Sequence, residues 1–398
     1  MNDAPKDSDA LEALPWGDNR REGYAGSASD AYTASSSPDQ GRTDAVSDVR
    51  RALEEIILQP GLRGGHEVLP TGDDPAGKRV ISNSQIKTYK RCQEEYRFKY
   101  VLGREEKGRP HPFAFGSVLD AGLGELWQSG SLEDALKVAE EVYETEKPIL
   151  NDWDFVKIEV LIRGYEVYYR EDGFETLAVQ HAFWVDKGDY VLHGIQDAIR
   201  LSRDKERVGW ELKSTGLDFF PGSDYEVLLQ LDSQVGIYFE GAEQAGFGYD
   251  TLVYDIVGKR MPDPLLATPV ENRRYRKGDG ELYAKQRLED ENIDQYRERA
   301  LDVVLKNPRW FYRRIDIVRL EAERQELRED VEMTVQDMLR VVPDKKRPRT
   351  DGSCKRYKRL CPYAGVCMKQ ESLYDNDIFQ KRTRREARPA TADGEVSA

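Results

Sequence analysis

The sequence predicts an α/β protein in which a mixed central sheet is flanked by helices and a helical lobe lies beside it. Three segments, 177–185, 190–201 and 207–215, alternate apolar and polar residues with a period of two, which is typical of strands. Short turn sequences, DKGD and SRDKE, join them. Helical periodicity before and after these strands, together with a further strand at 251–257, predicts the α/β class.

The helices are expected in the following order. The first begins near Ser82 or Ser84, and Ile86, Tyr89, Tyr96 and Tyr100 share one of its faces with Cys92 midway along it. Apolar residues at helical spacing then predict helices over about 114–145, 150–172, 224–244, 290–306 and 321–340.

The two ends of the chain are expected to lie outside the folded domain at 80–372. Residues 1–42 are rich in Ser, Ala, Asp and Gly and are predicted to be disordered. Residues 43–59 have the apolar spacing of a short helix, which either packs on the domain or docks a partner, and a linker follows to residue 79. Residues 373–398 are expected to form a flexible tail.

The composition limits the classes of function. Lys and Arg number 60 and Asp and Glu number 74 in 398 residues, so the net charge is −14 and DNA binding requires a local basic surface. No apolar run reaches the roughly 18 residues of a membrane span. The N-terminus does not resemble a signal peptide, and we expect a cytoplasmic protein, in the host cytoplasm if it is viral.

Two carboxylates and a lysine are expected on one face of the sheet. If the SRDKE turn centres near Asp204, paired residues on its two strands have numbers that sum to about 408, as Asp197 and Glu211 do. Lys213 shares the face of Glu211, whereas Leu212 points to the other side. Close carboxylates repel unless a cation joins them, and oxygen ligands suit Mg²⁺ or Mn²⁺. The alternative is an ordinary surface salt bridge.

This pattern resembles the core of the PD-(D/E)XK (restriction-endonuclease-like) nucleases, and further motifs resemble their RecB-like exonuclease branch. The motifs are Asp197 with Glu211-x-Lys213, the helix sequence from Ser82 to Tyr96, Phe115-Gly116-Ser-Val-Leu, and Gln234-x-x-x-Tyr238. The resemblance implies a metal-dependent deoxyribonuclease that hydrolyses phosphodiester bonds. It would act as an exonuclease at single-stranded DNA ends.

The resemblance also implies roles for individual residues. Asp197 and Glu211 would bind Mg²⁺ or Mn²⁺, with the Leu212 carbonyl as an extra ligand. Lys213 would position the attacking water, and Gln234 and Tyr238, one helical turn apart, would face the active site and hold DNA.

One position departs from the family pattern. Asp120 stands four residues after Gly116, where the family usually has a histidine ligand. An aspartate suits Mg²⁺, so we expect Asp120 to be a metal ligand. The change also allows a second function, a non-catalytic DNA-end binding protein, and a zinc-stapled nucleotide hydrolase is a weaker third. His193 is expected to be structural, and no role is predicted for Gln180.

The four cysteines are unevenly placed, with Cys92 alone and Cys354, Cys361 and Cys367 together. Their spacing does not match the paired Cys-x-x-Cys of zinc knuckles. RecB-like nucleases of the AddB and CRISPR-adaptation types carry a 4Fe–4S cluster. The spacing of Cys361 and Cys367 resembles that of the last two cysteines of its motif, so we expect an iron–sulfur staple. Zn²⁺ or free thiols are the alternatives. Because the C-terminal segment is polar, it is not expected to dock by burial alone.

A basic segment surrounds these cysteines. Residues 343–360 have a net charge of +6 in a chain of net charge −14. We expect a DNA-binding patch there, with Tyr357 and Tyr363 available for stacking on bases. The patch comprises Lys345, Lys346, Arg347, Arg349, Lys355, Arg356, Lys358 and Arg359.

The expected partner is DNA. The chain has no GxxxxGK[ST] motif, so any helicase or recombination motor would be a separate protein. DNA recombination, DNA repair and phage DNA metabolism all agree with this interpretation.

Overall fold

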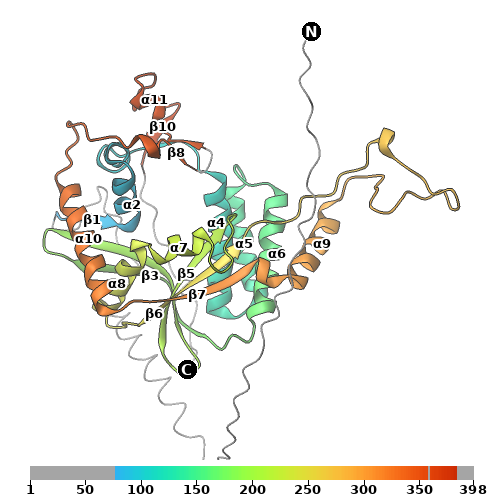
Figure 1. The fold of residues 1–398 in the computed structure, drawn as a ribbon, viewed down its shortest axis with the longest axis horizontal. Helices are drawn as coiled ribbons and strands as arrows, with labels where there is room; N and C mark the ends of the chain where they lie inside the picture. The colour runs from blue at the N-terminus through green and yellow to red at the C-terminus, as the bar shows by residue number, and fades with distance from the viewer. Residues whose placement is uncertain (1–76, 357–358, 383–398) are drawn as a thin grey trace, which may run out of the picture. The chain divides into compact units, whose positions relative to one another are not determined.

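The computed structural model describes residues 77–356 and 359–382 (Figure 1). The predicted disorder over 1–42, the short helix at 43–59 and most of the linker lie outside the described residues. Within the described part, the predicted α/β class is confirmed: helices flank a mixed sheet of six strands. The strands are β1 (Arg79–Ser82), β3 (Glu175–Asp186), β4 (Tyr190–Leu201), β5 (Arg207–Thr215), β6 (Thr251–Gly258) and β7 (Tyr312–Val318).

Long strand β4 organises the sheet. Strand β3 pairs antiparallel along one edge of β4. The other edge is shared, because β1 pairs with the beginning of β4 in parallel and β5 pairs with its end antiparallel. Strand β5 continues into β6 in parallel, and β6 pairs antiparallel with β7. The predicted hairpin register is confirmed, since Ala198 lies opposite Trp210 and the two numbers sum to 408.

Two helical layers cover the sheet. The main hydrophobic core lies between the sheet and α4, α5, α6 and α9, and it contains Trp210 and Val253 from the strands. Helices α2, α8 and α10 contact one another, and α8 packs on β3 and β4. The long helices are α2 (Asn83–Arg91), α4 (His111–Ser129), α5 (Leu132–Glu146), α6 (Asp152–Tyr169), α8 (Ser233–Gln244), α9 (Ile293–Lys306) and α10 (Glu321–Leu339), and α7 (Asp224–Gln230) is shorter.

Three predicted helices are interrupted. The helix over 114–145 divides at Gly130, whose φ of 69° ends α4 before Ser131 caps α5. The helix over 224–244 divides before α8, because the side chain of Asp232 accepts from the Gln234 amide as an N-cap. The helix from Ser82 stops at Cys92, which is extended with φ −159° and separates α2 from α3 (Gln93–Tyr96).

Two strands of the central sheet were not predicted. Strand β1 has four residues and follows a segment interpreted as linker, so its sequence is too short to show a period. Strand β7 lies in a region interpreted as mainly helical, and its buried positions include Tyr312 and Ile315 beside the charged Arg314. The charges hide the alternation, because Arg314 is used in a buried ion pair rather than exposed to solvent.

The segment after residue 340 folds back on the beginning of the domain. Strand β10 (Phe379–Lys381) pairs with β2 (Arg104–Glu106), and β8 (Lys355–Arg356) pairs with β9 (Arg359–Leu360). A second hydrophobic cluster joins Phe98 to Tyr363, Leu373 and Phe379. The first residues of the predicted flexible tail are therefore packed, and we extend the domain proposed from the sequence, 80–372, to residue 382.

No helix in the described ranges is both long enough and apolar enough to cross a membrane.

Candidate active site

The sheet opens at Asp197. The ladder between β4 and β5 ends at Ala198 and Trp210, and the ladder between β4 and β1 ends at His193. Between these points, β4 has no strand partner on that edge among the described residues. Here the Asp197 side chain replaces a backbone carbonyl as the acceptor, because its Oδ2 accepts from the amide of Leu212 at 2.8 Å. The gap in the ladder thus places an acidic side chain between two strands that are otherwise paired.

Glu211 and Lys213 lie on β5 with their side chains toward α8. Lys213 Nζ donates to Glu211 Oε1 at 2.5 Å and to Gln234 Oε1 at 2.9 Å. Gln234 Nε2 in turn donates to Glu211 Oε1 at 2.8 Å. Tyr238, one turn further along α8, donates its hydroxyl proton to the Ile195 carbonyl at 2.8 Å. The structure therefore brings Gln234 and Tyr238 to the carboxylate and lysine, as the sequence motif predicts.

Asp120 approaches the same place from α4. Its carboxylate is close enough to those of Glu211 and Asp197 for their charges to repel, and Gln180 Nε2 donates to its Oδ2 at 3.3 Å. Gln180 itself has a positive φ of 48° within β3. A non-glycine residue in this backbone region is strained, and such strain concentrates at functional sites. The prediction gave Gln180 no role; the signal available was its position between Val179 and His181, whose partners Ala198 and Gln196 flank Asp197.

The electrostatics of the site favour a bound cation. Burial and the charge of Glu211 raise the pKa of Asp120 to about 7. Burial, Glu211 and Asp120 also raise the pKa of Asp197 well above its usual value. Burial lowers the pKa of Lys213, but the neighbouring carboxylates outweigh it and the net pKa is raised, so Lys213 stays protonated. The site therefore concentrates negative charge that Lys213 only partly balances.

A family model described as the PD-(D/E)XK nuclease superfamily matches residues 80–368. The chain belongs to this superfamily. Among solved structures, a Eubacterium rectale protein provisionally assigned as an exonuclease is 18% identical, with a TM-score of 0.32 over 59% of this chain and 81% of its own. A second structure, of SSO0001, is 12% identical, with a TM-score of 0.28 over 82% of this chain and 98% of its own. No curated protein matches the chain.

The superfamily implies a divalent metal, and the acidic residues can be tested for it. Glu211 Oε2 is buried and has no hydrogen-bond partner among the described residues. An orphaned, buried carboxylate oxygen needs a cation or a proton. In the arrangement seen, however, Lys213 and Leu212 occupy oxygens of the carboxylates, and no group of three or more His, Cys, Asp or Glu within 77–356 and 359–382 is arranged to hold a metal. The donor set fits Mg²⁺ or Mn²⁺, provided that these hydrogen bonds rearrange.

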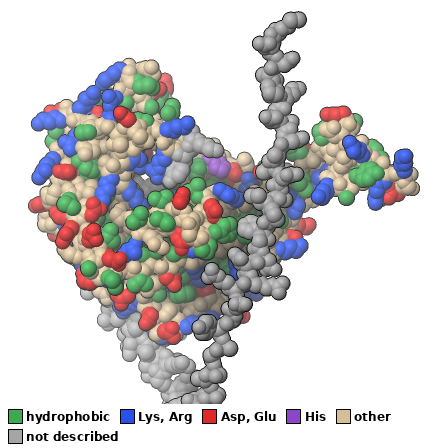
Figure 2. All heavy atoms as spheres, viewed as in Figure 1, with side chains coloured by type: hydrophobic (Ala, Val, Ile, Leu, Met, Phe, Trp, Pro, Cys, Tyr) green, Lys and Arg blue, Asp and Glu red, His purple; other side chains and the backbone are tan. Residues whose placement is uncertain are grey.

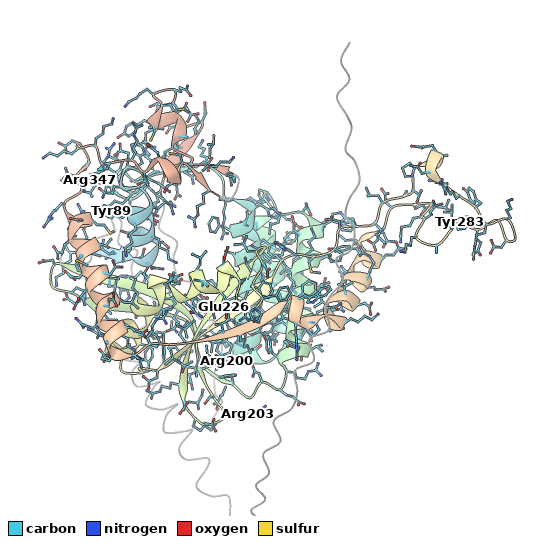
Figure 3. All side chains as sticks on the ribbon, viewed as in Figure 1. Tyr89, Arg200, Arg203, Glu226, Tyr283 and Arg347 are labelled. Carbon is cyan, nitrogen blue, oxygen red and sulfur yellow. The ribbon has the colours of Figure 1, made fainter. Side chains whose placement is uncertain are left out.

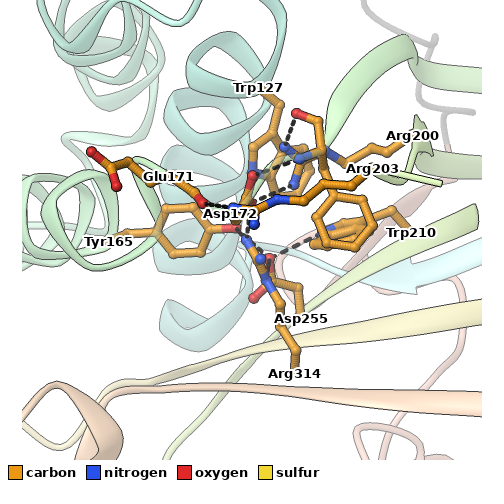
Figure 4. Close-up of polar contacts among 10 residues, drawn as sticks. Trp127, Tyr165, Glu171, Asp172, Arg200, Arg203, Trp210, Asp255 and Arg314 are labelled. Atoms are coloured by element: carbon orange, nitrogen blue, oxygen red, sulfur yellow. Dashed lines mark hydrogen bonds and ion pairs between the residues drawn. The ribbon is translucent and has the colours of Figure 1, made fainter. Parts of the chain in front are cut away.

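A buried polar network surrounds Trp210 (Figure 4), whose side chain points to the face of β5 opposite that of Glu211 because the two residues are consecutive. Trp210 Nε1 donates to Asp255 Oδ2 at 3.0 Å, and Tyr165 donates to the same oxygen. Arg314 completes the network, with Nη2 at 2.9 Å from the Tyr165 hydroxyl and at 2.8 Å from Asp172. Trp210 directly precedes Glu211, so the hydrogen bonds of this network fix the position of the active-site segment of β5.

Two histidines contact the surrounding fold. His193 Nδ1 is 3.0 Å from the carbonyl oxygen of Phe183, and its ring stacks on Trp184. His111 pairs with Asp154 at 3.0 Å.

The four cysteines line one small cavity, and none forms a disulfide. Cys92 lies at the break between α2 and α3, where its extended backbone separates the two helices. The β8–β9 hairpin joins Cys354 to Cys361, whose amide donates to the Cys354 carbonyl at 2.7 Å. Cys367 ends the short helix α11 (Ala364–Cys367). Burial raises the pKa of the Cys361 thiol to about 11 and also raises that of Cys367, so without a cation these thiols stay protonated.

The C-terminal segment, which was not expected to dock by burial alone, makes buried aromatic contacts with the rest of the domain. Tyr363 stacks on Phe379 with ring centroids 5.6 Å apart, and its hydroxyl donates to the Arg104 carbonyl at 2.7 Å. Figure 3 shows Arg347 and Tyr89 close together, and Arg347 Nη2 lies 3.2 Å from the Tyr89 hydroxyl. These contacts cannot be read from the local sequence, because the partners lie some 260 residues apart in the chain.

The basic segment is divided between structure and surface. Arg347 is half-buried, and its amide donates to Glu94 at 2.9 Å. Arg359 lies 4.0 Å from Glu106. Lys358 and Tyr357 lie outside the described residues. The exposed members, which remain candidates for contact with DNA, are Lys345, Lys346, Arg349, Lys355, Arg356 and Arg359.

Proposed function

We propose that the chain is a divalent-metal-dependent DNA exonuclease of the RecB-like branch that hydrolyses phosphodiester bonds at single-stranded ends. One observation carries the proposal. The sheet opens at Asp197, and three carboxylates and a protonated lysine gather there with an unpartnered buried oxygen on Glu211. A structural ion pair has no need of a third carboxylate whose pKa is raised to about 7.

The residues divide the chemistry between them. Asp120, Asp197, Glu211 and the Leu212 carbonyl would hold Mg²⁺ or Mn²⁺, which when bound polarises a phosphate oxygen and acidifies a water. Lys213 orients the attacking water and offsets the charge that grows on phosphorus. Gln234 fixes the direction of Lys213 through its 2.9 Å hydrogen bond. Tyr238, which is tied to β4 through Ile195, supports Gln234.

The four cysteines are proposed to hold a 4Fe–4S cluster. The support is their donor chemistry: four thiols from two distant parts of the chain line one cavity. The cluster would fasten the basic segment beside the nuclease domain, in addition to the aromatic contacts of Tyr363 and Phe379. Zn²⁺ is the competing occupant.

The proposed function is tested with the full chain purified without oxygen. Single-stranded oligonucleotides labelled at the 5′ or the 3′ end are incubated with Mn²⁺ or Mg²⁺, and the products are resolved with time. We expect stepwise shortening from one end that stops with EDTA. DNA binding without any cleavage would instead favour the non-catalytic DNA-end binding protein. Addition of a helicase or recombination protein to the assay then tests for a partner in repair, recombination or phage DNA metabolism.

A further inference from the structure

A long crossover between β6 and α9, residues 259–292, forms an arm that carries its own basic and aromatic surface. Figure 1 shows this arm reaching away from the sheet, and Tyr283 lies far out along it in Figure 3. The active site as described above uses none of its side chains. We propose that the arm binds single-stranded DNA that enters or leaves the active site. The identity of the ligand as DNA rests on the proposed nuclease function.

The arm is a hairpin with a defined backbone. Tyr275 and Leu282 form an antiparallel bridge, and the amide of Arg276 donates to the Glu281 carbonyl at 2.7 Å. Nearer its base, the Thr268 amide donates to the Arg287 carbonyl at 2.9 Å. These bonds hold the side chains of the outer part in a fixed order along two paired strands, which is a better binding surface than an unstructured loop.

The base of the arm is attached beside the catalytic strand. The Lys259 amide donates to the Thr215 carbonyl at 2.7 Å, and Arg260 Nε donates to the Gly216 carbonyl at 2.6 Å. Thr215 lies two residues after Lys213 on β5. Lys259 Nζ also lies 5.5 Å from the ring of Phe115, which precedes Gly116 on α4. A strand that leaves the active site past the end of β5 therefore meets the arm first.

The outer part of the arm is positively charged, although the chain as a whole is negatively charged. Residues 273–287 contain six Lys or Arg and two Asp or Glu, a net charge of +4 in a chain of net charge −14. Arg276 pairs with Glu281 and with Asp279, which uses both acidic residues. In the described part of the chain, no ion pair is found for Arg274, Lys277 or Lys285, and all three are exposed. They are available to phosphates.

Two exposed tyrosines favour a single strand over a duplex. Tyr275 and Tyr283 are each 52% exposed, far more than a tyrosine that contributes to a core. Unpaired bases stack on exposed aromatic rings, whereas the bases of a duplex already stack on each other. Figure 2 shows basic side chains mixed with hydrophobic ones along the arm. The exposed apolar residues Leu266, Val270 and Leu288 lie nearer the base of the arm, whereas the two tyrosines of the outer part are interspersed with basic residues, which suits a nucleic acid better than a protein.

Binding is measured without cleavage, with the full chain in EDTA and a fluorescein-labelled oligo(dT) probe followed by anisotropy at several salt concentrations. One variant reverses the three free charges (Arg274→Glu, Lys277→Glu and Lys285→Glu), and another combines Tyr275→Ala with Tyr283→Ala. A matched control reverses three exposed lysines on other elements, Lys137→Glu, Lys205→Glu and Lys306→Glu.

We expect the arm reversal to weaken binding by at least about tenfold and to lower the salt slope by about two, since each single-strand phosphate contact contributes about 0.7 to that slope. The tyrosine variant should lose about fivefold or more. The control should stay within about twofold of the unmodified chain after its added negative charge, and a blunt duplex should be less sensitive to the tyrosine change.

The outcomes separate this inference from the proposed function. If the chain digests DNA but the arm variants bind oligo(dT) as tightly as the unmodified chain, the arm inference is overturned and the nuclease proposal stands. If the control weakens binding as much as the arm reversal does, the effect is one of net charge and the inference is again overturned. If the chain neither binds nor digests DNA, both proposals fail.

Discussion

Lys213 Nζ donates to Glu211 Oε1 at 2.5 Å, while Oε2 of the same carboxylate is buried without a partner among the described residues. One oxygen of Glu211 is thus neutralised by the chain itself, and the other is left for a cation. The pair lies two residues apart on β5, so the strand alone brings both side chains to one face.

Removing either member of this pair should abolish cleavage while the protein stays folded. We expect Glu211→Gln and Lys213→Ala each to lower the rate of DNA digestion by about two to three orders of magnitude or more, because each removes a charge at the reacting phosphate. The measurement is the digestion of an end-labelled oligonucleotide with Mn²⁺. Circular dichroism checks the fold.

The control for this experiment is Glu240→Gln. Glu240 is also buried and pairs with a lysine, Lys187, at 2.6 Å, but it lies away from the carboxylate cluster. It should retain most of the activity. Cleavage by Glu211→Gln at the rate of the unmodified chain would remove Glu211 from the active site.

Stabilisation by Mn²⁺ should grow as the pH rises. The pKa of Asp120 is about 7 in the metal-free fold against an ordinary value of 3.8, so the folded state binds more protons between these values and Asp120 lowers stability as the pH rises. A divalent ion takes the place of that proton. We therefore expect the increase in Tm caused by Mn²⁺ to be larger at about pH 8 than at about pH 5.5.

Two variants test the assignment to Asp120. Asp120→Asn cannot titrate, so its Mn²⁺-dependent rise in Tm should be smaller and depend less on pH. Gln180→Leu keeps the carboxylate but removes its 3.3 Å hydrogen-bond donor, and should keep the pH dependence. An identical Tm shift at both pH values in the unmodified chain would contradict a role for Asp120 in metal binding.

Substitution of any one of the four cysteines should remove the bound metal, and the C-terminal segment should stay docked. Cys361→Ser is expected to abolish the visible absorption and iron content of protein purified without oxygen, because a 4Fe–4S cluster needs all its thiolates. Tyr363→Ala should instead leave the thiols in place and destabilise the docked segment, since Tyr363 is only 2% exposed. If the protein is colourless and contains stoichiometric zinc, the result would contradict the 4Fe–4S cluster and support a zinc site.

The network behind β5 should matter for stability more than any exposed ion pair. Arg314→Met leaves the buried Asp255 without its cation, and breaking a buried pair in this way costs about 3–5 kcal/mol in the free energy of unfolding. Lys306→Met, which breaks an exposed pair with Asp302, should cost less than about 1 kcal/mol. Urea denaturation measures both. Equal midpoints for the two variants would show that the network contributes no more than a surface pair.

The active-site strands could be predicted because their information is local. The turn after Leu201 sets the register of the β4–β5 hairpin, and this register holds as far as Ala198 and Trp210, the residues next to Asp197 and Glu211. The period of two within β5 then fixes Lys213 on the same face. The helix spacing of Gln234 and Tyr238 is local in the same sense, although only the family pattern pointed them toward the site.

Other parts depended on contacts between distant residues. Strand β7 was missed because Arg314 reads as exposed until Asp255 on β6 and Tyr165 on α6 are brought beside it. Helix breaks at Cys92 and Asp232 were missed because each stretch has continuous helical spacing, although Asp232 is a favourable N-cap residue.

The sequence by itself determined the strand register and the shared face of Glu211 and Lys213, because turn chemistry and side-chain period act over a few residues. The four cysteines are likewise visible in the sequence. Only the tertiary structure decided that β4 stays unpaired beside Asp197, that Gln180 reaches Asp120, and that Tyr363 docks the C-terminal segment. Those outcomes depend on which distant surfaces exclude water together. Burial energy is a property of the assembled surfaces, and no local pattern in the chain records it.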